Sequence, residues 1–241
     1  MTLPKIDQPI SKIEIPSTKK QAIFRPFLVK EEKILLMAKE SEDPSDILTA
    51  IKQIVTNCSL DPTVTIDTLS IFDLEYIYLK LRSISVNNII KIIVTDYDDK
   101  KDYELEINLN DVKVDFPEKF DNKIKITDKT GIIMKYPSST LYNDSEYLNS
   151  QDDFLFNLMV RCIDKIYDGD TVYEASNYSK SDLSEFLENL NLKTYEQIKT
   201  FLNSTPKLKY TLEYKNSLGQ DKKVEFNSLN DFFTFRWIII I

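Results

Sequence analysis

Residues 24–37 read FRPFLVKEEKILLM and indicate how the first part of this chain folds. Pro26 holds the backbone extended between two phenylalanines, because its ring fixes φ at about −65°. Glu31 and Glu32 then stand where carboxylates suit the positive end of a helix dipole. The stretch therefore predicts a strand that leads into a helix over Lys30–Glu40.

The residues on either side of this stretch predict a strand pair and a second helix. Lys12–Ile15 and Ala22–Phe24 read as two short strands around a polar turn. Asp43 and Pro44 predict the start of a helix, with Asp43 as its N-cap and Pro44 in its first position. One face of this helix carries apolar residues at helical spacing, namely Ile47, Ile51, Ile54 and Cys58.

A third helix is expected to begin at Ser70, which with Asp73 resembles a capping box. Its inward residues are expected to be Leu74, Ile77 and Leu81. The first helix should pack against the apolar stripe of the second. We expect the inward side chains of that region to be Phe24, Phe27, Ile34, Leu35 and Ala38.

The spacing of apolar residues then changes from helical to alternating. Ile90–Val94 and Tyr103–Leu109 alternate on either side of the polar turn Asp96–Lys101, which predicts an antiparallel hairpin with one solvated face. A second hairpin is predicted over Ile124–Met134, with its turn at Asp128–Gly131. The central part of the chain is therefore expected to be a β-sheet region.

Helical spacing returns in the last third of the chain. One helix is predicted over residues 152–166, and two shorter ones over 181–190 and 194–203. A final hairpin is predicted over 208–226, and Ser228 is expected to cap a short helix together with an aspartate three residues later. The apolar stripe of the first of these helices consists of Leu155, Leu158, Met159, Cys162, Ile163 and Ile166.

Taken together, these elements predict an α+β fold in which helices and antiparallel hairpins are segregated along the chain. Residues 1–85 are expected to form an N-terminal strand pair with a helical block. Residues 86–150 are expected to form the β-hairpin region. Residues 151–241 are expected to form a C-terminal α+β region, either separate from the N-terminal block or continuous with it as one domain.

Composition excludes several classes of enzyme. The 241 residues contain no His, so the commonest general base and metal ligand is missing. Only three glycines are present, and they lie far apart, so a glycine-rich phosphate-binding loop is missing as well. Cys58 and Cys162 stand at apolar positions and are expected to be buried free thiols. We therefore expect no metal and no cofactor.

Charge and hydropathy restrict the partners. The formal net charge is −8, without a basic block, which disfavours broad binding to nucleic acid. No segment reaches the ~20 apolar residues that a membrane span needs, and the first residues do not read as a secretory signal. We therefore expect a protein of the cytoplasm in which it is made, with no nucleic-acid or membrane partner.

Two functional alternatives remain open from the residues alone. The acidic clusters Asp96–Asp99 and Asp152–Asp153 could serve a small carboxylate-based hydrolase, although a turn and a helix start favour acidic residues for structural reasons. The tyrosine-rich last hairpin, with Tyr210 and Tyr214, could stack nucleic-acid bases. The inward face of an antiparallel sheet is the simpler reading of those tyrosines.

Several motifs in the first 85 residues resemble the T4-type bacteriophage baseplate protein family. The longest is the stretch 24–38, preceded by Leu3-Pro4-Lys5 and by Ile15-Pro16-Ser17-Thr18. The resemblance covers residues 3 to 85, and beyond them it rests on similar length and element order. Further matching motifs are Ile51–Cys58, Phe72–Tyr76 and Leu81-Arg82-Ser83.

The resemblance implies a non-enzymatic protein of contractile-tailed phages that acts in assembly of the tail baseplate hub, as an assembly factor or hub subunit. It implies other baseplate hub proteins as partners, and a location in the host cytoplasm during assembly or in the virion baseplate. No catalytic residues are carried over. Arginine and aromatic residues are favoured interface anchors. We therefore expect a partner interface at Arg25, Phe27, Lys30, Glu31 and Lys33.

Overall fold

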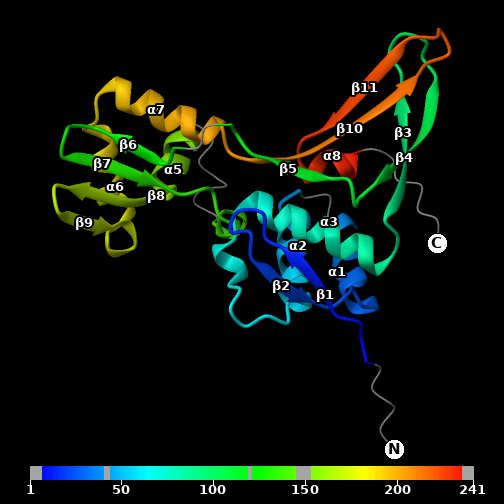
Figure 1. Ribbon diagram of the computed structural model, residues 1–241, viewed down its shortest axis with the longest axis horizontal. Coiled ribbons are helices and arrows are strands. Elements are labelled where there is room, and N and C mark those ends of the chain that lie inside the picture. Colours follow the sequence, from blue (N-terminus) through cyan, green and yellow to red (C-terminus); the bar gives the residue numbers. More distant parts are fainter. Residues whose placement is uncertain (1–6, 41–43, 119–120, 145–152, 235–241) are drawn as a thin grey trace, which may run out of the picture. The chain divides into compact units, whose positions relative to one another are not determined.

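The computed structural model describes residues 7–40, 44–118, 121–144 and 153–234 (Figure 1). Its contacts divide the chain into two compact units. Unit 1 consists of the described parts of Met1–Asp115 and Lys207–Ile241, and unit 2 is Phe116–Pro206. Unit 1 thus combines the two ends of the described chain. The three regions expected from the sequence are instead consecutive segments. The α+β class is confirmed.

Unit 1 begins with the expected strand pair, β1 (Ser11–Glu14) and β2 (Gln21–Phe24), which is antiparallel. Side chains alternate between solvent and the interior, because successive residues of a strand point to opposite faces. Ile13, Ala22 and Phe24 are buried. The prediction that Phe24 lies in the core is therefore confirmed.

Three helices follow in unit 1: α1 (Val29–Glu40), α2 (Pro44–Cys58) and α3 (Ile71–Ser85). A short 3-10 turn, η1 (Ile66–Thr68), precedes α3. The proposed N-cap Asp43 lies outside the described residues. The helices pack their apolar faces together, as expected from the spacing. The buried residues of this helical layer include Leu35, Ala38, Ile51, Ile54, Leu74, Ile77 and Leu81, while Ile34 and Ile47 are half-buried.

The start of α3 differs from the expected capping box. Ser70 is the N-cap, but its side chain accepts no hydrogen bond from the first turn of the helix. Asp73 is buried and accepts a hydrogen bond of 2.8 Å from the backbone N–H of Ser17. Asp73 therefore ties the turn between β1 and β2 to α3, a role that sequence spacing alone did not indicate.

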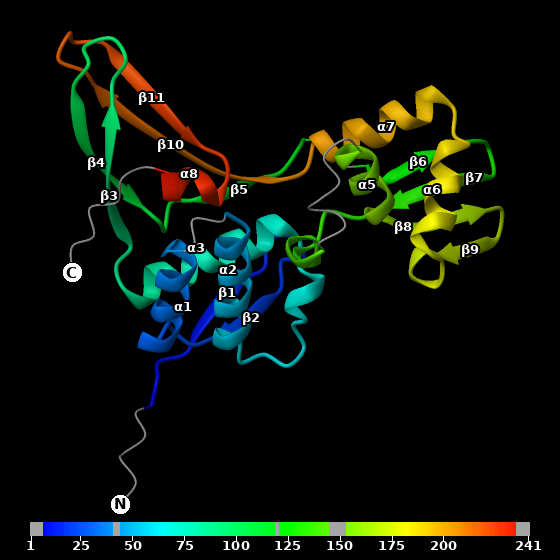
Figure 2. The ribbon, with the colours of Figure 1, turned by 180° about the vertical axis from the view of Figure 1, so that it is seen from behind.

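Four long strands complete the larger part of unit 1. The hairpin β3 (Ile89–Thr95) with β4 (Asp102–Asn108) is the first one predicted, and the hairpin β10 (Lys207–Lys215) with β11 (Asp221–Phe226) is the last one predicted. Both are confirmed. Figures 1 and 2 show from opposite sides that the two hairpins run next to each other and end together.

The base of the last hairpin is extended by two short elements. Strand β5 (Lys113–Asp115) pairs with β10 and gives the sheet order β11-β10-β5. Helix α8 (Leu229–Thr234) follows β11, and Phe232 on it is buried beside Phe226, with ring centroids 5.0 Å apart. The carboxylate of Asp231 accepts the N–H of Ser228 at 2.8 Å, as the predicted cap requires.

Unit 2 is built on a four-stranded antiparallel sheet in the order β6-β7-β8-β9. These strands are β6 (Lys123–Lys125), β7 (Thr130–Met134), β8 (Ile163–Asp168) and β9 (Thr171–Glu174). The hairpin β6-β7 is the second one predicted, and it is confirmed.

Helices α5 (Phe154–Arg161), α6 (Lys180–Glu188) and α7 (Leu192–Asn203) supply the rest of the unit 2 core, with short 3-10 turns η2 (Ser139–Asn143) and η3 (Ala175–Asn177) between elements. Apolar side chains from the sheet and the helices form one buried cluster. Its fully buried members include Ile132, Met134, Met159, Val160, Cys162, Ile163 and Ile198.

The single helix predicted over residues 152–166 is wrong in its second half. Helix α5 ends at Arg161, and β8 begins at Ile163 and pairs with β7. A run of apolar residues fits a helical stripe and a buried strand almost equally well. The turn at Gly169, where φ is +59°, closes a hairpin between β8 and β9 that the sequence reading missed.

Gly131 allows three strands of unit 2 to pack closely. It lies on β7, opposite Lys125 and Tyr167. A Cβ atom added there would lie 2.7 Å from the carbonyl oxygen of Ile124 and 2.2 Å from the hydroxyl of Tyr167. Gly131→Ala should therefore destabilise the protein by about 1–3 kcal/mol, as overpacking does. Urea unfolding checks this, and a variant as stable as the wild type would contradict it.

Candidate functional site

The stretch at residues 24–37 places a buried ion pair at the entrance to α1. The Arg25 guanidinium donates to both carboxylate oxygens of Glu31, from Nη1 to Oε2 at 3.1 Å and from Nη2 to Oε1 at 2.9 Å. The Glu31 side chain is 0% exposed and the Arg25 side chain only 12%. This two-pronged geometry is the strongest form of a carboxylate–guanidinium contact.

The pair also holds three separate elements together. Arg25 donates to the carbonyl oxygens of Pro26 at 2.9 Å and Asn57 at 2.8 Å, and Glu31 accepts the N–H of Leu28 at 2.9 Å. It thereby links the end of β2, the first turn of α1 and the end of α2. Every polar contact named here lies within unit 1.

The pKa values of the pair follow from these contacts. The hydrogen bond to Glu31 raises the pKa of Arg25 above its ordinary value. Burial by itself would raise the pKa of Glu31, but the hydrogen bonds from Arg25 and Leu28 outweigh it and hold that pKa below the ordinary value. Both groups are therefore charged at neutral pH.

The other three residues of the predicted interface lie nearer the surface. Phe27 is half-buried, with its ring centroid 5.7 Å from that of Tyr78. Lys30 and Lys33 are exposed, and the Nζ of Lys30 lies 3.7 Å from Glu31. The structure thus turns Arg25 and Glu31 toward each other and leaves the lysines accessible. A role of these five residues in contacting a partner stays a prediction.

Helix α1 also has an outward apolar face that the sequence reading missed. Val29, Leu36 and Met37 are exposed on it, together with Lys33. Positions 29, 33, 36 and 37 share one side of a helix, because side chains three and four residues apart are neighbours. The sequence did contain a signal for this face, because the helix has apolar residues on both of its sides. That pattern is typical of a helix that is buried on both sides.

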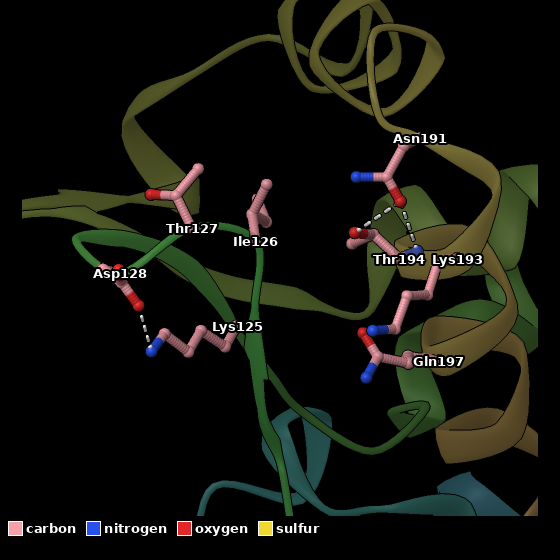
Figure 3. A pocket seen from close by; sticks show the side chains of 8 residues that line it. All are labelled: Lys125, Ile126, Thr127, Asp128, Asn191, Lys193, Thr194 and Gln197. Carbon is pink, nitrogen blue, oxygen red and sulfur yellow. Dashed lines mark hydrogen bonds and ion pairs between the residues drawn. The ribbon is translucent and has the colours of Figure 1, made fainter.

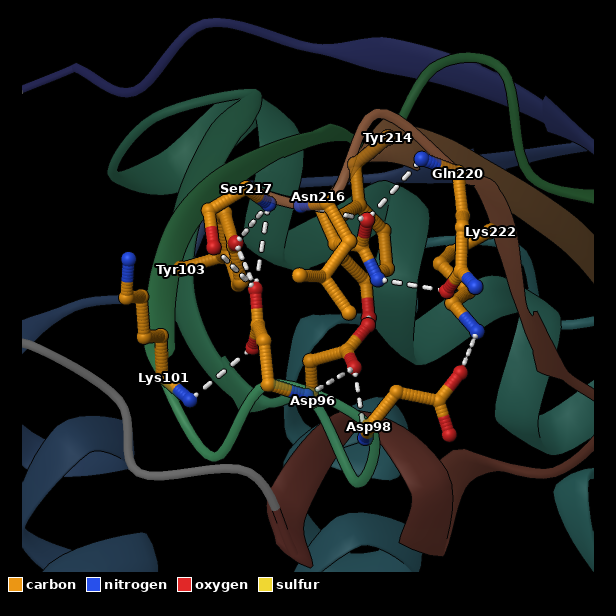
Figure 4. Close-up of polar contacts among 11 residues, drawn as sticks. Asp96, Asp98, Lys101, Tyr103, Tyr214, Asn216, Ser217, Gln220 and Lys222 are labelled. Carbon is orange, nitrogen blue, oxygen red and sulfur yellow. Dashed lines mark hydrogen bonds and ion pairs between the residues drawn. The ribbon is translucent and has the colours of Figure 1, made fainter.

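A second polar cluster joins the tips of the two long hairpins of unit 1 (Figure 4). The hydroxyl of Tyr214 donates to Asp96 at 2.8 Å. Asp99 accepts from the N–H of Ser217 at 3.0 Å, from its hydroxyl at 2.8 Å and from the hydroxyl of Tyr103 at 2.5 Å. The two turns are therefore bonded to each other although they are 118 residues apart in the chain.

These contacts determine the charge state of the acidic turn. The hydrogen bond from Tyr103 holds the pKa of Asp99 well below its ordinary value. Burial alone would raise the pKa of Asp96, but the hydrogen bond from Tyr214 and the backbone N–H groups more than compensate. Burial and Asp96 raise the pKa of Tyr214 to about 12. Charged carboxylates and neutral tyrosines are thus stable partners at neutral pH.

The arrangement bears on both functional alternatives. The carboxylate oxygens of Asp96 and Asp99 accept hydrogen bonds from the chain itself. Asp152 of the other acidic cluster lies outside the described residues. The ring of Tyr210 packs edge-on against Phe226, and Tyr214 lies 5.1 Å from Tyr103. Asp96 and Asp99 are therefore not an unbonded acid pair, and Tyr210 and Tyr214 each contact another aromatic ring.

A hollow of about 570 Å³ in unit 2 lies between β6 and α7 (Figure 3). Several of its polar groups bind one another: Lys125 pairs with Asp128 at 2.7 Å, and Asn191 caps α7 by accepting the N–H of Thr194 at 2.9 Å. Only one apolar side chain lines it. The lining residues are Lys125, Ile126, Thr127, Asp128, Asn191, Lys193, Thr194 and Gln197.

The described part of the chain contains no assembled metal site and no reactive thiol. No group of three or more His, Cys, Asp or Glu side chains is placed there to hold a metal ion. Cys58 and Cys162 are free and buried, as predicted, and burial raises their pKa values to about 11 and about 12. Among the same residues, every helix is too short or too polar to cross a bilayer.

Comparison with known protein families gives a match over most of the chain. The family model described as T4 bacteriophage base plate protein matches residues 8–234. No curated protein and no solved structure matches the chain. The matched range extends well beyond residue 85, where the motif resemblance found in the sequence ends.

Proposed function

This chain belongs to the T4 bacteriophage base plate protein family, and on that premise we propose that it acts without catalysis in assembly of the phage baseplate hub, as an assembly factor or as a hub subunit. The family itself implies a structural or assembly role in the baseplate. The observation that carries the proposal is the extent of the match, which includes residues of both units.

The use of the polar side chains supports a role without turnover. A general base or nucleophile must keep an atom free for the substrate. The carboxylates of Glu31, Asp96 and Asp99 instead accept hydrogen bonds from their own chain. A catalytic activity that disappears on substitution of one carboxylate, with the fold intact, would contradict this part of the proposal.

We place one partner surface on the outward face of α1. Val29, Leu36 and Met37 supply apolar area there, and Lys30 and Lys33 supply positive charge in a chain of net charge −8. The occupant that fits is a surface of another baseplate hub protein with apolar side chains and carboxylates. The Arg25–Glu31 pair and Phe27 contribute indirectly, because they hold α1 in position from its inner side.

This surface predicts the result of a binding experiment with the other baseplate hub proteins, each co-expressed with the chain and recovered by pull-down. The double variant Lys33→Glu, Met37→Asp should weaken binding of its partner at least about tenfold, because it places charge in an apolar contact and reverses a complementary one. Lys193→Glu on α7 is the matched control and should bind like the wild type. Equal binding by both variants would remove α1 from the interface.

Mass spectrometry of purified virions separates the two roles. An assembly factor that leaves would be missing from mature particles, whereas a hub subunit would give many peptides. The host cytoplasm is the location during assembly in both cases.

A further inference from the structure

The two locked hairpins of unit 1 present an anchor at their shared end. We call β3-β4 and β10-β11, with the turns 96–101 and 216–220, the arm. We propose that the arm tip is a docking element, in which Tyr97 and Leu218 enter an apolar pocket of another baseplate protein. The inference rests on the proposed function for the class of partner, and it assigns a surface distinct from α1.

The first observation is the exposure of two large apolar side chains at that end. Tyr97 is 87% exposed and Leu218 is 61% exposed. Tyr97 stands between Asp96 and Asp98, which bind Tyr214 and Lys222 of the other hairpin. Leu218 follows Ser217, which binds Asp99. Both exposed residues are therefore direct chain neighbours of residues that bond the two hairpins together.

The second observation is that both turns are held in one conformation. Within the first turn, Asp96 accepts the N–H of Asp98 at 2.8 Å, and its own N–H donates to Lys101 at 2.9 Å. Within the second, the side-chain oxygen of Asn216 accepts the N–H groups of Leu218 at 3.1 Å and Gln220 at 2.9 Å. A side chain on a rigid backbone loses little conformational entropy on binding.

Tyrosine is well suited to this position. It provides a large contact area with only two side-chain torsions, and it is enriched among the residues that dominate binding energies. The Nζ of Lys100 lies 5.7 Å from the centroid of the Tyr97 ring. Its exposed face is therefore available to a partner.

The charges around the tip define the rim of the pocket that would receive it. The carboxylates of Asp98 and Asp99 are directed to Lys222 and Ser217 of the other hairpin. Lys100 and Lys101 are exposed, and Figure 4 shows the side chain of Lys101 extending away from the network. The turn 96–101 therefore carries both signs of charge: its aspartates are bonded within the network, whereas Lys100 and Lys101 are exposed beside Tyr97. The pocket that fits is apolar and has carboxylates where it meets these two lysines.

The test measures the affinity of the purified full chain for each of the other baseplate proteins of the same phage, purified one by one. The double variant Tyr97→Ala, Leu218→Ala should bind its partner at least about thirtyfold more weakly, as the loss of a dominant anchor does. The control is Leu192→Ala with Tyr178→Ala, since Leu192 is 82% exposed and both residues lie in unit 2. The control should bind within about twofold of the wild type.

Two further variants separate a docking role from a structural one. Lys100→Glu with Lys101→Glu should slow association about tenfold at low salt and leave the melting temperature unchanged. Asp99→Ala should weaken binding even though Tyr97 and Leu218 are retained, because Ser217, next to Leu218, loses both of its hydrogen bonds to Asp99.

The outcomes distinguish this inference from the proposed function. If the wild type binds a baseplate protein and the Tyr97, Leu218 double variant binds it equally well, the arm-tip inference is overturned and the baseplate role stands. If the wild type binds none of the baseplate proteins, the proposed function fails and the inference fails with it. Loss of binding in the double variant at an unchanged melting temperature supports the inference.

Discussion

Arg25→Ala should lower the free energy of unfolding by about 3–5 kcal/mol, the effect of removing one member of a buried ion pair. The substitution leaves the carboxylate of Glu31, which is 0% exposed, with only the N–H of Leu28 at 2.9 Å and Lys30 at 3.7 Å. An uncompensated buried charge is expensive because water can no longer solvate it. Chemical denaturation at neutral pH measures the loss.

Two comparisons sharpen this expectation. Lys30→Ala removes a neighbouring exposed charge and should change stability by no more than about 0.5 kcal/mol. The double variant Arg25→Met, Glu31→Leu removes both charges and should be more stable than Arg25→Ala alone, since apolar groups can replace a buried pair. A stable Arg25→Ala protein that no longer binds its baseplate partner would instead place Arg25 in an interface.

The structure reverses the expected order of the stability losses caused by Phe27→Ala and Arg25→Ala. If Phe27 were a fully buried core residue, as the sequence suggests, Phe27→Ala would cost about 3–5 kcal/mol of stability, more than Arg25→Ala. The ring of Phe27 is only half-buried, whereas Arg25 compensates a fully buried carboxylate. We therefore expect the reverse order, with Arg25→Ala the more destabilising substitution.

Stability should also fall with rising pH because of one carboxyl group on α3. Burial raises the pKa of Glu75 from 4.5 to about 7, with a further contribution from Asp231, although the N–H of Leu229 donates to Glu75 at 3.4 Å. Its folded pKa lies above the unfolded one, so the folded state binds the proton more tightly between those values. The contribution of Glu75 is present below about pH 4.5 and declines by about 3 kcal/mol as pH rises through 7.

Glu75→Gln isolates this effect from the other carboxylates. The amide keeps an oxygen for the N–H of Leu229 but cannot ionise. The variant should match the wild type near pH 4.5 and exceed its stability by up to about 3 kcal/mol at pH 8. Asp99, whose pKa is lowered, gives the opposite slope in both proteins and cancels in the difference. A stability difference that is the same at both pH values would contradict the prediction.

Much of the architecture could be predicted because local spacing reports which face of an element is buried. The alternation at Ile90–Val94 and Tyr103–Leu109 predicted the β3-β4 hairpin, and the helical spacing of Ile51, Ile54 and Cys58 predicted the buried face of α2. In these elements the side-chain period and the tertiary environment agree, so a sequence pattern suffices.

The predicted helix failed where two readings fit the same residues. Ile163 and Ile166 continue the apolar spacing of α5, and they also suit a buried strand. The choice between the two is made by β7, which offers β8 a free edge about thirty residues earlier in the chain. No local pattern contains that pairing, because a strand is stabilised by its neighbour rather than by itself.

The candidate surfaces were predictable only in part. The stretch around Arg25 and Lys33 was recognised as unusual, but not which of its residues face inward. The arm tip was read as an ordinary acidic turn at Asp96–Asp99. Its bonds to Tyr214 and Ser217 join positions 118 residues apart, and no spacing rule connects such positions.

Residue patterns were enough to predict the α+β class, the strand that leads into α1, the buried thiols and the motifs that resemble the baseplate family. Each of these depends on periodicity, composition or a contiguous string of residues. The folded chain was needed to show that Arg25 faces Glu31, that β8 is a strand and that the two hairpin tips are bonded. These depend on contacts between distant residues, whose free energy arises only when the whole unit is folded.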